Sequence, residues 1–176
     1  MSIKRPFNIY KWIEDHRQEL KPPVGNRNLY HEADDFIVMI VAGPNARKDY
    51  HYNETEEWFF QLEGDITVRI QENGQAVDVP IKQGEIFLLP AKTPHSPIRP
   101  EGTLGLVIEA KRKSGEQDGL LWFCENCNEK LHESYFPLTN IEKDFIPRFK
   151  EYYTNESMRT CKSCGKVMEA DPRFVG

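Results

Sequence analysis

Three side chains that could bind a metal ion lie at the ends of short apolar segments of the chain. His51 is followed after five residues by Glu57, and His95 follows a third segment that could bring it alongside the other two. Two neutral imidazoles and one carboxylate occupy one face of a metal ion and leave positions open on the other side. That arrangement suits Fe(II) that must hold a substrate and O₂ together, although zinc could also occupy these ligands.

Other residues compete for these ligand positions. Glu56 precedes Glu57, but neighbouring side chains of a β-strand point to opposite faces, so only one of the two should point inward. We expect that residue to be Glu57. A single histidine near a strand end is more often a hydrogen-bonded surface residue than a ligand, and His16, His31 and His132 have no context that argues otherwise.

The cysteines predict a second, closed metal site. They form two matched pairs, Cys124-Glu-Asn-Cys127 and Cys161-Lys-Ser-Cys164. Four thiolates around one ion give a tetrahedral zinc or iron site, whose role should be structural because no coordination position is open. Paired disulfides and a redox-active CxxC are the alternatives. We favour metal, because two matched pairs fit one site and no βα redox context precedes either pair.

The segments around the candidate ligands predict a mainly β chain. Runs rich in β-branched and aromatic residues occur at residues 36–42, 58–62, 66–71, 77–81, 86–89 and 104–108. Turn sequences containing Gly, Pro or Asn separate these runs, at a spacing typical of an antiparallel barrel or sandwich. No alternation of strands and helices appears, which argues against a doubly wound fold.

Helices are expected at the two ends of the chain. Behind Asn8 the apolar residues have helical spacing, and this helix should stop at Lys-Pro-Pro, residues 21–23. Thr139 and Glu142 have the spacing of a capping box for a later helix, which Pro147 should kink or restart.

We expect one principal domain with a small C-terminal appendage. Residues 111–119 are charged and contain glycine, which is the composition of an exposed connection. The predicted division is a catalytic barrel with its N-terminal helix at residues 1–119, and a C-terminal segment with the four-cysteine site at residues 120–176.

Composition narrows the range of partners. The 176 residues carry a formal charge of −5 with scattered basic residues, which argues against a nucleic-acid partner. The first residues have no apolar run of signal-peptide length, and no segment approaches the roughly 20 apolar residues that span a bilayer. We expect a cytoplasmic protein without membrane association.

The ligand pattern resembles the cupin superfamily, whose first motif contains His, Glu and Gly and whose second supplies another His after a Gly-containing turn. The matching residues are His51, Glu57 and Gly64, then Gly84 and His95. The usual first motif has two histidines one residue apart, whereas Asp49 and Asn53 stand at that spacing here, which favours a three-ligand site. The resemblance implies a double-stranded β-helix, the cupin jelly-roll barrel, with an N-terminal helix and a small C-terminal helical segment that carries the CxxC pairs.

A narrower resemblance covers essentially the whole chain from about Phe7. It is carried by Pro22-Pro-Val-Gly-Asn-Arg27, Gly43-Pro-Asn with Arg47, Asp49-Tyr-His51, Glu56-Glu57, Ile86-Phe-Leu-Leu-Pro90 and His95-Ser-Pro-Ile-Arg99-Pro. These segments are similar to the 3-hydroxyanthranilate 3,4-dioxygenase family. Its members use Fe(II) and O₂ to open an aromatic ring that carries adjacent hydroxyl and amino groups and a carboxylate. The family product, 2-amino-3-carboxymuconate semialdehyde, closes to quinolinate, a step of the kynurenine pathway that serves NAD biosynthesis or tryptophan degradation.

The same resemblance implies roles for individual residues. Arg99 would pair with the substrate carboxylate, Arg47 would lie beside the substrate hydroxyl and oxygen, and Glu109 would accept a hydrogen bond from the ring amine. Asn26 and Pro97 would line the pocket. Taken alone, each charged residue would more often be a solvated surface charge or part of an ion pair. The resemblance further implies a homodimer, and iron in the four-cysteine site of bacterial-type chains.

Two other functions stay open at this stage. The chain could be a non-catalytic cupin that senses a small carboxylate and docks a partner through its cysteine segment, or another cupin oxygenase or isomerase. An open triad together with two pocket arginines favours the dioxygenase, because a mere binding protein would not require both.

Overall fold

The computed structural model of the chain describes residues 5–20, 25–140 and 143–175. The elements are α1 (Ile9–His16), a 3₁₀ turn (Arg17–Leu20), β1 (Asn26–Asn28), β2 (Phe36–Ala42), β3 (Asn45–Ala46), β4 (Tyr50–Tyr52), β5 (Glu57–Glu63), β6 (Ile66–Glu72), β7 (Gln75–Ile81), β8 (Ile86–Leu89), β9 (His95–Arg99), β10 (Leu104–Ala110), β11 (Asp118–Phe123), β12 (Lys130–Phe136), α2 (Phe145–Thr154) and α3 (Glu156–Arg159). Among these residues, no helix has the length and apolar character that crossing a membrane requires.

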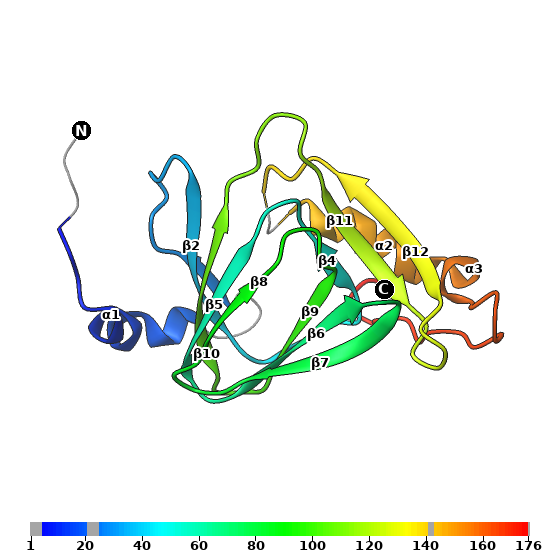
Figure 1. Cartoon of the computed structure of the whole chain (residues 1–176), viewed down its shortest axis with the longest axis horizontal. Coiled ribbons are helices and arrows are strands. Elements are labelled where there is room, and N and C mark those ends of the chain that lie inside the picture. Colours follow the sequence, from blue (N-terminus) through cyan, green and yellow to red (C-terminus); the bar gives the residue numbers. More distant parts are fainter. Residues whose placement is uncertain (1–4, 21–24, 141–142, 176) are drawn as a thin grey trace.

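Two antiparallel sheets form the barrel (Figure 1). One sheet has the strand order β1-β2-β10-β5-β8, and the other has the order β12-β11-β4-β9-β6-β7, with β3 also paired to β9. Many neighbours in these orders are distant in sequence, as in a jelly roll, where strands from both halves of the chain alternate. The expected mainly β fold with an N-terminal helix is confirmed.

The main core lies between the two sheets. One face of each strand supplies it, because side chains alternate along a strand. In β6, for example, Ile66, Val68 and Ile70 are buried while the residues between them are partly exposed. Their partners across the barrel include Met39 of β2 and Val107 of β10. Side chains at the ends of these strands are therefore attached to a well-packed core.

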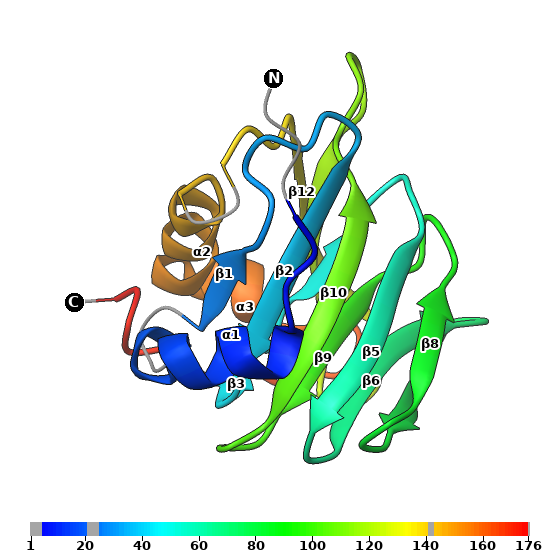
Figure 2. The same ribbon diagram turned by 90° about the vertical axis from the view of Figure 1, so that its left-hand side faces the viewer.

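Helix α1 covers the outer face of the first sheet (Figure 2). Its buried Ile13 packs with Ile40 of β2, Leu62 of β5 and Leu104 of β10. The helix begins where the sequence predicts, because the Asn8 side chain accepts a hydrogen bond from the Lys11 backbone N–H at 3.1 Å. The predicted stop at residues 21–23 lies outside the described residues.

The six predicted strands are present, with ends that differ by no more than a few residues. Strands β2 and β8 have the expected bounds, and β5, β6, β7 and β10 are slightly longer. Among the strands that the pattern missed are β4 and β9, which carry the two histidines. Both are short and rich in polar residues, so they lack the apolar alternation that identifies a strand.

The C-terminal part of the chain continues the second sheet. Strand β11 pairs with β4, and β12 pairs with β11. Helix α2 packs on these strands through a second core that includes Trp122, Phe136, Phe149 and Tyr152. The predicted division after residue 119 falls inside β11. The division into a barrel and a C-terminal segment therefore stays a prediction, and the second sheet runs across the predicted boundary.

The start of α2 differs from the prediction. The helix begins at Phe145, and Asp144 Oδ2 accepts hydrogen bonds from the backbone and hydroxyl of Thr139. Thr139 is therefore a donor in a turn before the helix and does not cap it, while Glu142 lies outside the described residues. Pro147 occupies the first turn, where its missing N–H has no helical partner to lose, so it neither kinks nor restarts the helix.

Candidate metal centres and substrate pocket

The three candidate metal ligands converge from both sheets. His51 of β4 stands directly opposite His95 of β9, and their ring centroids are 5.3 Å apart. Glu57 begins β5 in the facing sheet, so His51 and Glu57 come from different sheets. One ligand atom from each of the three residues lies within 4.8 Å of the others. Glu57 is buried and Glu56 is exposed, which agrees with the alternation argument.

Hydrogen bonds to the two histidines orient their rings. His51 Nε2 lies 2.6 Å from Asp118 Oδ2, and His95 Nδ1 lies 3.0 Å from the Thr93 carbonyl oxygen. When each of these nitrogens donates its proton, the lone pair of each ring is left on the other nitrogen. Metal-binding histidines commonly donate their second N–H to a carboxylate or carbonyl in this way. Burial also lowers the pKa of His51, which favours the neutral ring that binds metal.

The carboxylate completes a set of groups that fits a cation. Glu57 Oε2 is buried, lies 3.1 Å from His95 Nε2 and accepts no hydrogen bond from the described residues. A separation of about 3 Å is expected for two neighbouring ligands that are each about 2.1 Å from one ion. Two imidazoles and a carboxylate with one side free match a non-haem Fe(II) site.

A cavity of about 110 Å³ adjoins these ligands. It is lined by Asn26, Met39, Val41, Asn45, Arg47, His51, Glu57, Phe59, His95, Pro97, Arg99, Val107, Glu109 and Phe145. All of the residues that the sequence assigned to the metal triad and the substrate pocket border this one cavity. Apolar side chains from the barrel core form much of the remaining wall, as in most small-molecule pockets.

Arg99 is a buried cation with unused hydrogen-bonding capacity. Only 2% of the residue is exposed, and its Nε atom has no partner among the described residues. Its Nη1 lies 3.5 Å from the Gln61 side-chain oxygen. Burial lowers the pKa of Arg99 to about 10, so the side chain is still charged at neutral pH. Such a guanidinium can bind an anionic group that enters the cavity.

Two further charged residues, Arg47 and Glu109, line the cavity. Arg47 lies 3.3 Å from Asp49, and its guanidinium is 5.5 Å from the ring centroids of both Phe145 and Phe149 of α2. Glu109 is 2% exposed, and burial, with the nearby charge of Glu57, raises its pKa to about 7. The cavity therefore has a fixed cation and a carboxyl group of unusually high proton affinity.

Two residues at the site whose side chains are covered were missed by the sequence analysis. Asp118 is fully buried behind His51, and the Arg112 side chain, 8% exposed, contacts both Asp118 and Glu109. Both belong to the segment that was expected to be an exposed connection, which is wrong for these two residues. The charged composition of residues 111–119 gave no signal that two of the charges point inward.

The four cysteines form a second cluster. Cys124 Sγ lies 3.6 Å from Cys164 Sγ, and Cys127 Sγ lies 3.5 Å from Cys161 Sγ. A disulfide requires about 2.05 Å, whereas these separations fit thiolates that surround one metal ion at about 2.3 Å. The two turns match each other: in each, the backbone N–H four residues after the first cysteine donates to that cysteine's carbonyl at 2.9 Å. Asn128 and Gly165 occupy this position with positive φ.

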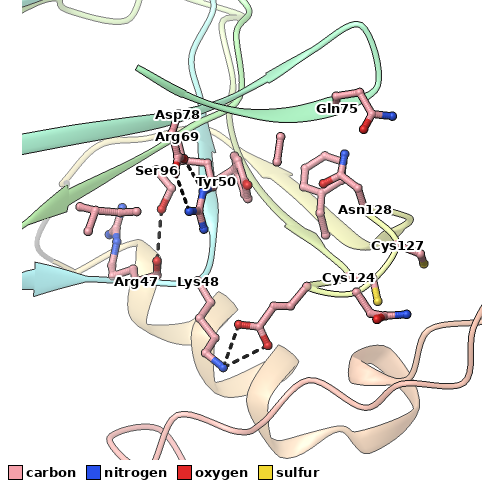
Figure 3. Close-up of a pocket in the computed structure, with 15 residues that line it drawn as sticks. Arg47, Lys48, Tyr50, Arg69, Gln75, Asp78, Ser96, Cys124, Cys127 and Asn128 are labelled. Carbon is pink, nitrogen blue, oxygen red and sulfur yellow. Dashed lines mark hydrogen bonds and ion pairs between the residues drawn. The ribbon is translucent and has the colours of Figure 1, made fainter. Parts of the chain in front are cut away.

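A larger recess is lined on one side by the first cysteine turn and on the other by barrel residues (Figure 3). It measures about 760 Å³ and extends from Cys124 and Cys127 to Arg47, which also lines the smaller cavity. Ion pairs cross or border the recess, between Lys48 and Glu125 and between Arg69 and Asp78. Arg47 therefore lies between the two hollows.

Comparison with known proteins gives concordant matches. The family model described as 3-hydroxyanthranilic acid dioxygenase matches residues 1–153. A protein of Xanthomonas campestris named 3-hydroxyanthranilate 3,4-dioxygenase is 56% identical over 170 residues, which cover 97% of this chain and 96% of the relative. Proteins with the same name from Jannaschia sp. and Ruegeria pomeroyi are 49% and 46% identical, each over 95% of this chain and 93% of the relative.

The solved structures that this chain matches are less similar to it in sequence. A cupin-2 domain protein from Shewanella frigidimarina has a TM-score of 0.47 with 18% identity, and the match covers 56% of this chain and 92% of that protein's chain. A putative sugar phosphate isomerase from Acidithiobacillus ferrooxidans has a TM-score of 0.44 with 16% identity, over 65% and 80% of the two chains. Likenesses of this degree say nothing of activity.

Replacing His51 should remove one metal site and leave the other. We expect His51→Ala to lower the metal content from about two ions per chain to about one, because two remaining ligands bind too weakly. Elemental analysis after gel filtration measures this, and circular dichroism should show an unchanged fold. His31→Ala, at an exposed histidine, is the control and should keep both ions. An unchanged metal content in His51→Ala would contradict the assigned site.

Replacing a cysteine should remove the four-cysteine site and leave the His51 site. Cys161→Ser should lower Tm by several degrees, because metal binding to a structural site stabilises the folded chain and each kcal/mol lost shifts Tm by about 2–4 °C in a chain of this size. Calorimetry measures the shift, and metal analysis should show that the His51 site still binds. Lys162→Ser, in the same turn, is the matched control. A Tm equal to that of the control would argue against a structural metal.

Proposed function

Because the chain belongs to the 3-hydroxyanthranilic acid dioxygenase family, we propose that it converts 3-hydroxyanthranilate and O₂ to 2-amino-3-carboxymuconate semialdehyde. Both oxygen atoms enter the product as one ring C–C bond breaks, so no further reductant is needed. The observation that supports this most directly is a single small cavity that borders the three ligands, Arg99, Arg47 and Glu109. An alternative cupin function would not require that whole set.

His51, Glu57 and His95 would hold the Fe(II) of this reaction. When bound, iron supplies the electronic link between an aromatic substrate and O₂ that organic side chains cannot provide. The protein contributes the three ligands from one side. The two imidazole rings are kept in place by the hydrogen bonds that they donate to Asp118 and to the Thr93 carbonyl. The vacant side of the ion would face the cavity.

Arg99 would fix the substrate through its carboxylate. The guanidinium is buried, charged and without a partner for its Nε atom, so an entering carboxylate replaces lost hydration with charge-assisted hydrogen bonds. Gln61 holds the other end of the fork at 3.5 Å. A planar bidentate contact of this kind would also set the orientation of the aromatic ring in the cavity.

Glu109 and Arg47 would act on the substituents at the reacting end of the ring. Glu109 lies opposite Glu57 in the β10–β5 pairing, and it would accept a hydrogen bond from the ring amine there. Arg47, held over two phenylalanine rings, would stabilise negative charge that develops on the substrate hydroxyl and on oxygen. Asn26 and Pro97 would complete the wall of the pocket.

Several further properties are part of the same proposal. The four-cysteine site would hold iron or zinc in a structural role, because four thiolates leave no open position. The protein would act in the cytoplasm as a homodimer, in the kynurenine pathway and pyridine nucleotide biosynthesis. It would need neither nucleic acid nor membrane.

Oxygen uptake tests the proposed reaction. Iron-loaded protein is mixed with 3-hydroxyanthranilate without air, O₂ is admitted, and oxygen consumption and ultraviolet absorption are followed. We expect about one O₂ consumed per substrate and a new product absorption. Anthranilate, which lacks the hydroxyl group, should give neither signal. Binding of 3-hydroxyanthranilate without oxygen uptake would contradict the enzyme and favour a sensor.

Arg99→Ala should mainly weaken substrate binding. A charge-assisted hydrogen bond contributes about 1.5–3 kcal/mol, so KM should rise about ten- to a hundredfold. Steady-state kinetics measures this, with Arg69→Ala, an arginine in a half-exposed ion pair, as the control. A normal KM in Arg99→Ala would remove its carboxylate role.

A further inference from the structure

Arg112 occupies an unusual position between two buried carboxylates. It follows the end of β10, three residues after Glu109, and its side chain turns back into the barrel mouth with 8% exposure. Its Nη1 atom lies 2.5 Å from Glu109 Oε2. Its Nε and Nη2 atoms donate to the two oxygens of Asp118 at 2.7 and 2.5 Å. All three nitrogens of the Arg112 guanidinium therefore donate hydrogen bonds to the two acids.

Each of these acids borders the proposed reaction site. Asp118 Oδ2 also lies 2.6 Å from His51 Nε2, so the same oxygen joins Arg112 and a metal ligand. Glu109 lines the cavity in which the substrate would bind. The contacts thus form a continuous chain from His51 through Asp118 and Arg112 to Glu109. In this series of contacts, the Arg112 guanidinium connects Asp118, which supports a proposed metal ligand, with Glu109, which lines the cavity.

Charge balance explains why a cation is needed there. Glu57, Glu109 and Asp118 are all less than 10% exposed, and an unpaired buried carboxylate is strongly destabilised. Glu57 faces the proposed metal, but Glu109 and Asp118 do not bind it directly in the assigned ligand set. The fixed planar fork of arginine can satisfy both acids, whereas the ammonium group of lysine is a single point charge.

We propose that Arg112 is a positioning residue that holds Asp118 behind His51 and Glu109 at the substrate in one rigid unit, and so supports both metal retention and substrate binding. The substrate half of this inference rests on the proposed function. The metal half does not, because it concerns only the support of His51. Loss of an indirect support of this kind typically lowers metal affinity about ten- to a hundredfold.

Three variants separate the two halves. Asp118→Asn should weaken metal binding and leave KM, measured at saturating Fe(II), within about twofold of wild type. Glu109→Gln should raise KM and leave metal affinity within about twofold. Arg112→Met should change both, with about tenfold or greater loss of metal affinity and a raised KM, because it releases both acids. A residue with only a structural role would lower Tm and change neither quantity at a temperature where the protein is folded.

Metal affinity is measured by chelator competition with Co(II), without any turnover. Thiolate-bound cobalt absorbs differently from cobalt bound to nitrogen and oxygen, so the two sites are read separately. Arg69→Met is the matched control, because Arg69 makes the same fork to Asp78 on the surface, with Nε and Nη2 at 2.6 and 2.9 Å. It should leave both metal affinity and KM unchanged.

A conservative variant covers the case in which Arg112→Met does not fold. Arg112→Lys keeps the charge but loses the fork, and we expect a smaller change than in Arg112→Met, with at least one of the two quantities still several-fold worse than wild type. The proposal would be overturned if Arg112→Lys kept the wild-type cobalt affinity and KM. It would also be overturned if the Arg69→Met control changed cobalt affinity and KM as much as Arg112→Met does. If the wild-type protein has no oxygenase activity, the proposed function fails, and cobalt affinity alone decides the role of Arg112.

Discussion

The balance of buried charge is the constraint on which the barrel mouth depends. Acids and imidazoles lie there with little access to water, and each buried ion must be paired or neutralised. Arg112 satisfies Glu109 and Asp118, Asp118 satisfies His51, and Glu57 is left with an acceptor oxygen directed at a place where a cation fits. The same balance of charge therefore leaves a place beside Glu57 where a metal ion fits.

The sheet arrangement brings these groups together at fixed distances. The antiparallel pairing of β4 with β9 places His51 opposite His95, and the pairing of β10 with β5 places Glu109 opposite Glu57. The two pairs come from facing sheets that share a close-packed core. Because ladder hydrogen bonds and core packing both fix the strands, the ligands need little rearrangement to bind an ion.

The C-terminal part of the chain joins the site through α2. Phe145, the first residue of this helix, packs 5.3 Å from the His51 ring and, together with Phe149, holds the Arg47 guanidinium. The first cysteine turn is tied to the β6–β7 hairpin, where the Asn128 side chain bonds to Gln71 and to the Gly74 carbonyl. The first cysteine turn is therefore hydrogen-bonded to the barrel, although the proposed roles of the two sites differ.

The sequence by itself determined the mainly β fold, six of the strands, the first helix and its Asn8 cap, and the residues that now border one cavity. The fold elements and the three metal ligands follow from local patterns: alternation of apolar residues, turn residues, and metal-binding side chains at recognisable spacing. The pocket residues Arg47, Arg99 and Glu109 were implied by the resemblance to a known family, because no local pattern distinguishes them from surface charges. Only the tertiary structure decided that His51 and Glu57 face each other from different sheets, and that β11 and β12 extend the barrel. It also placed Arg112 and Asp118 inside, because pairing between charges three to tens of residues apart leaves no periodic trace in the chain.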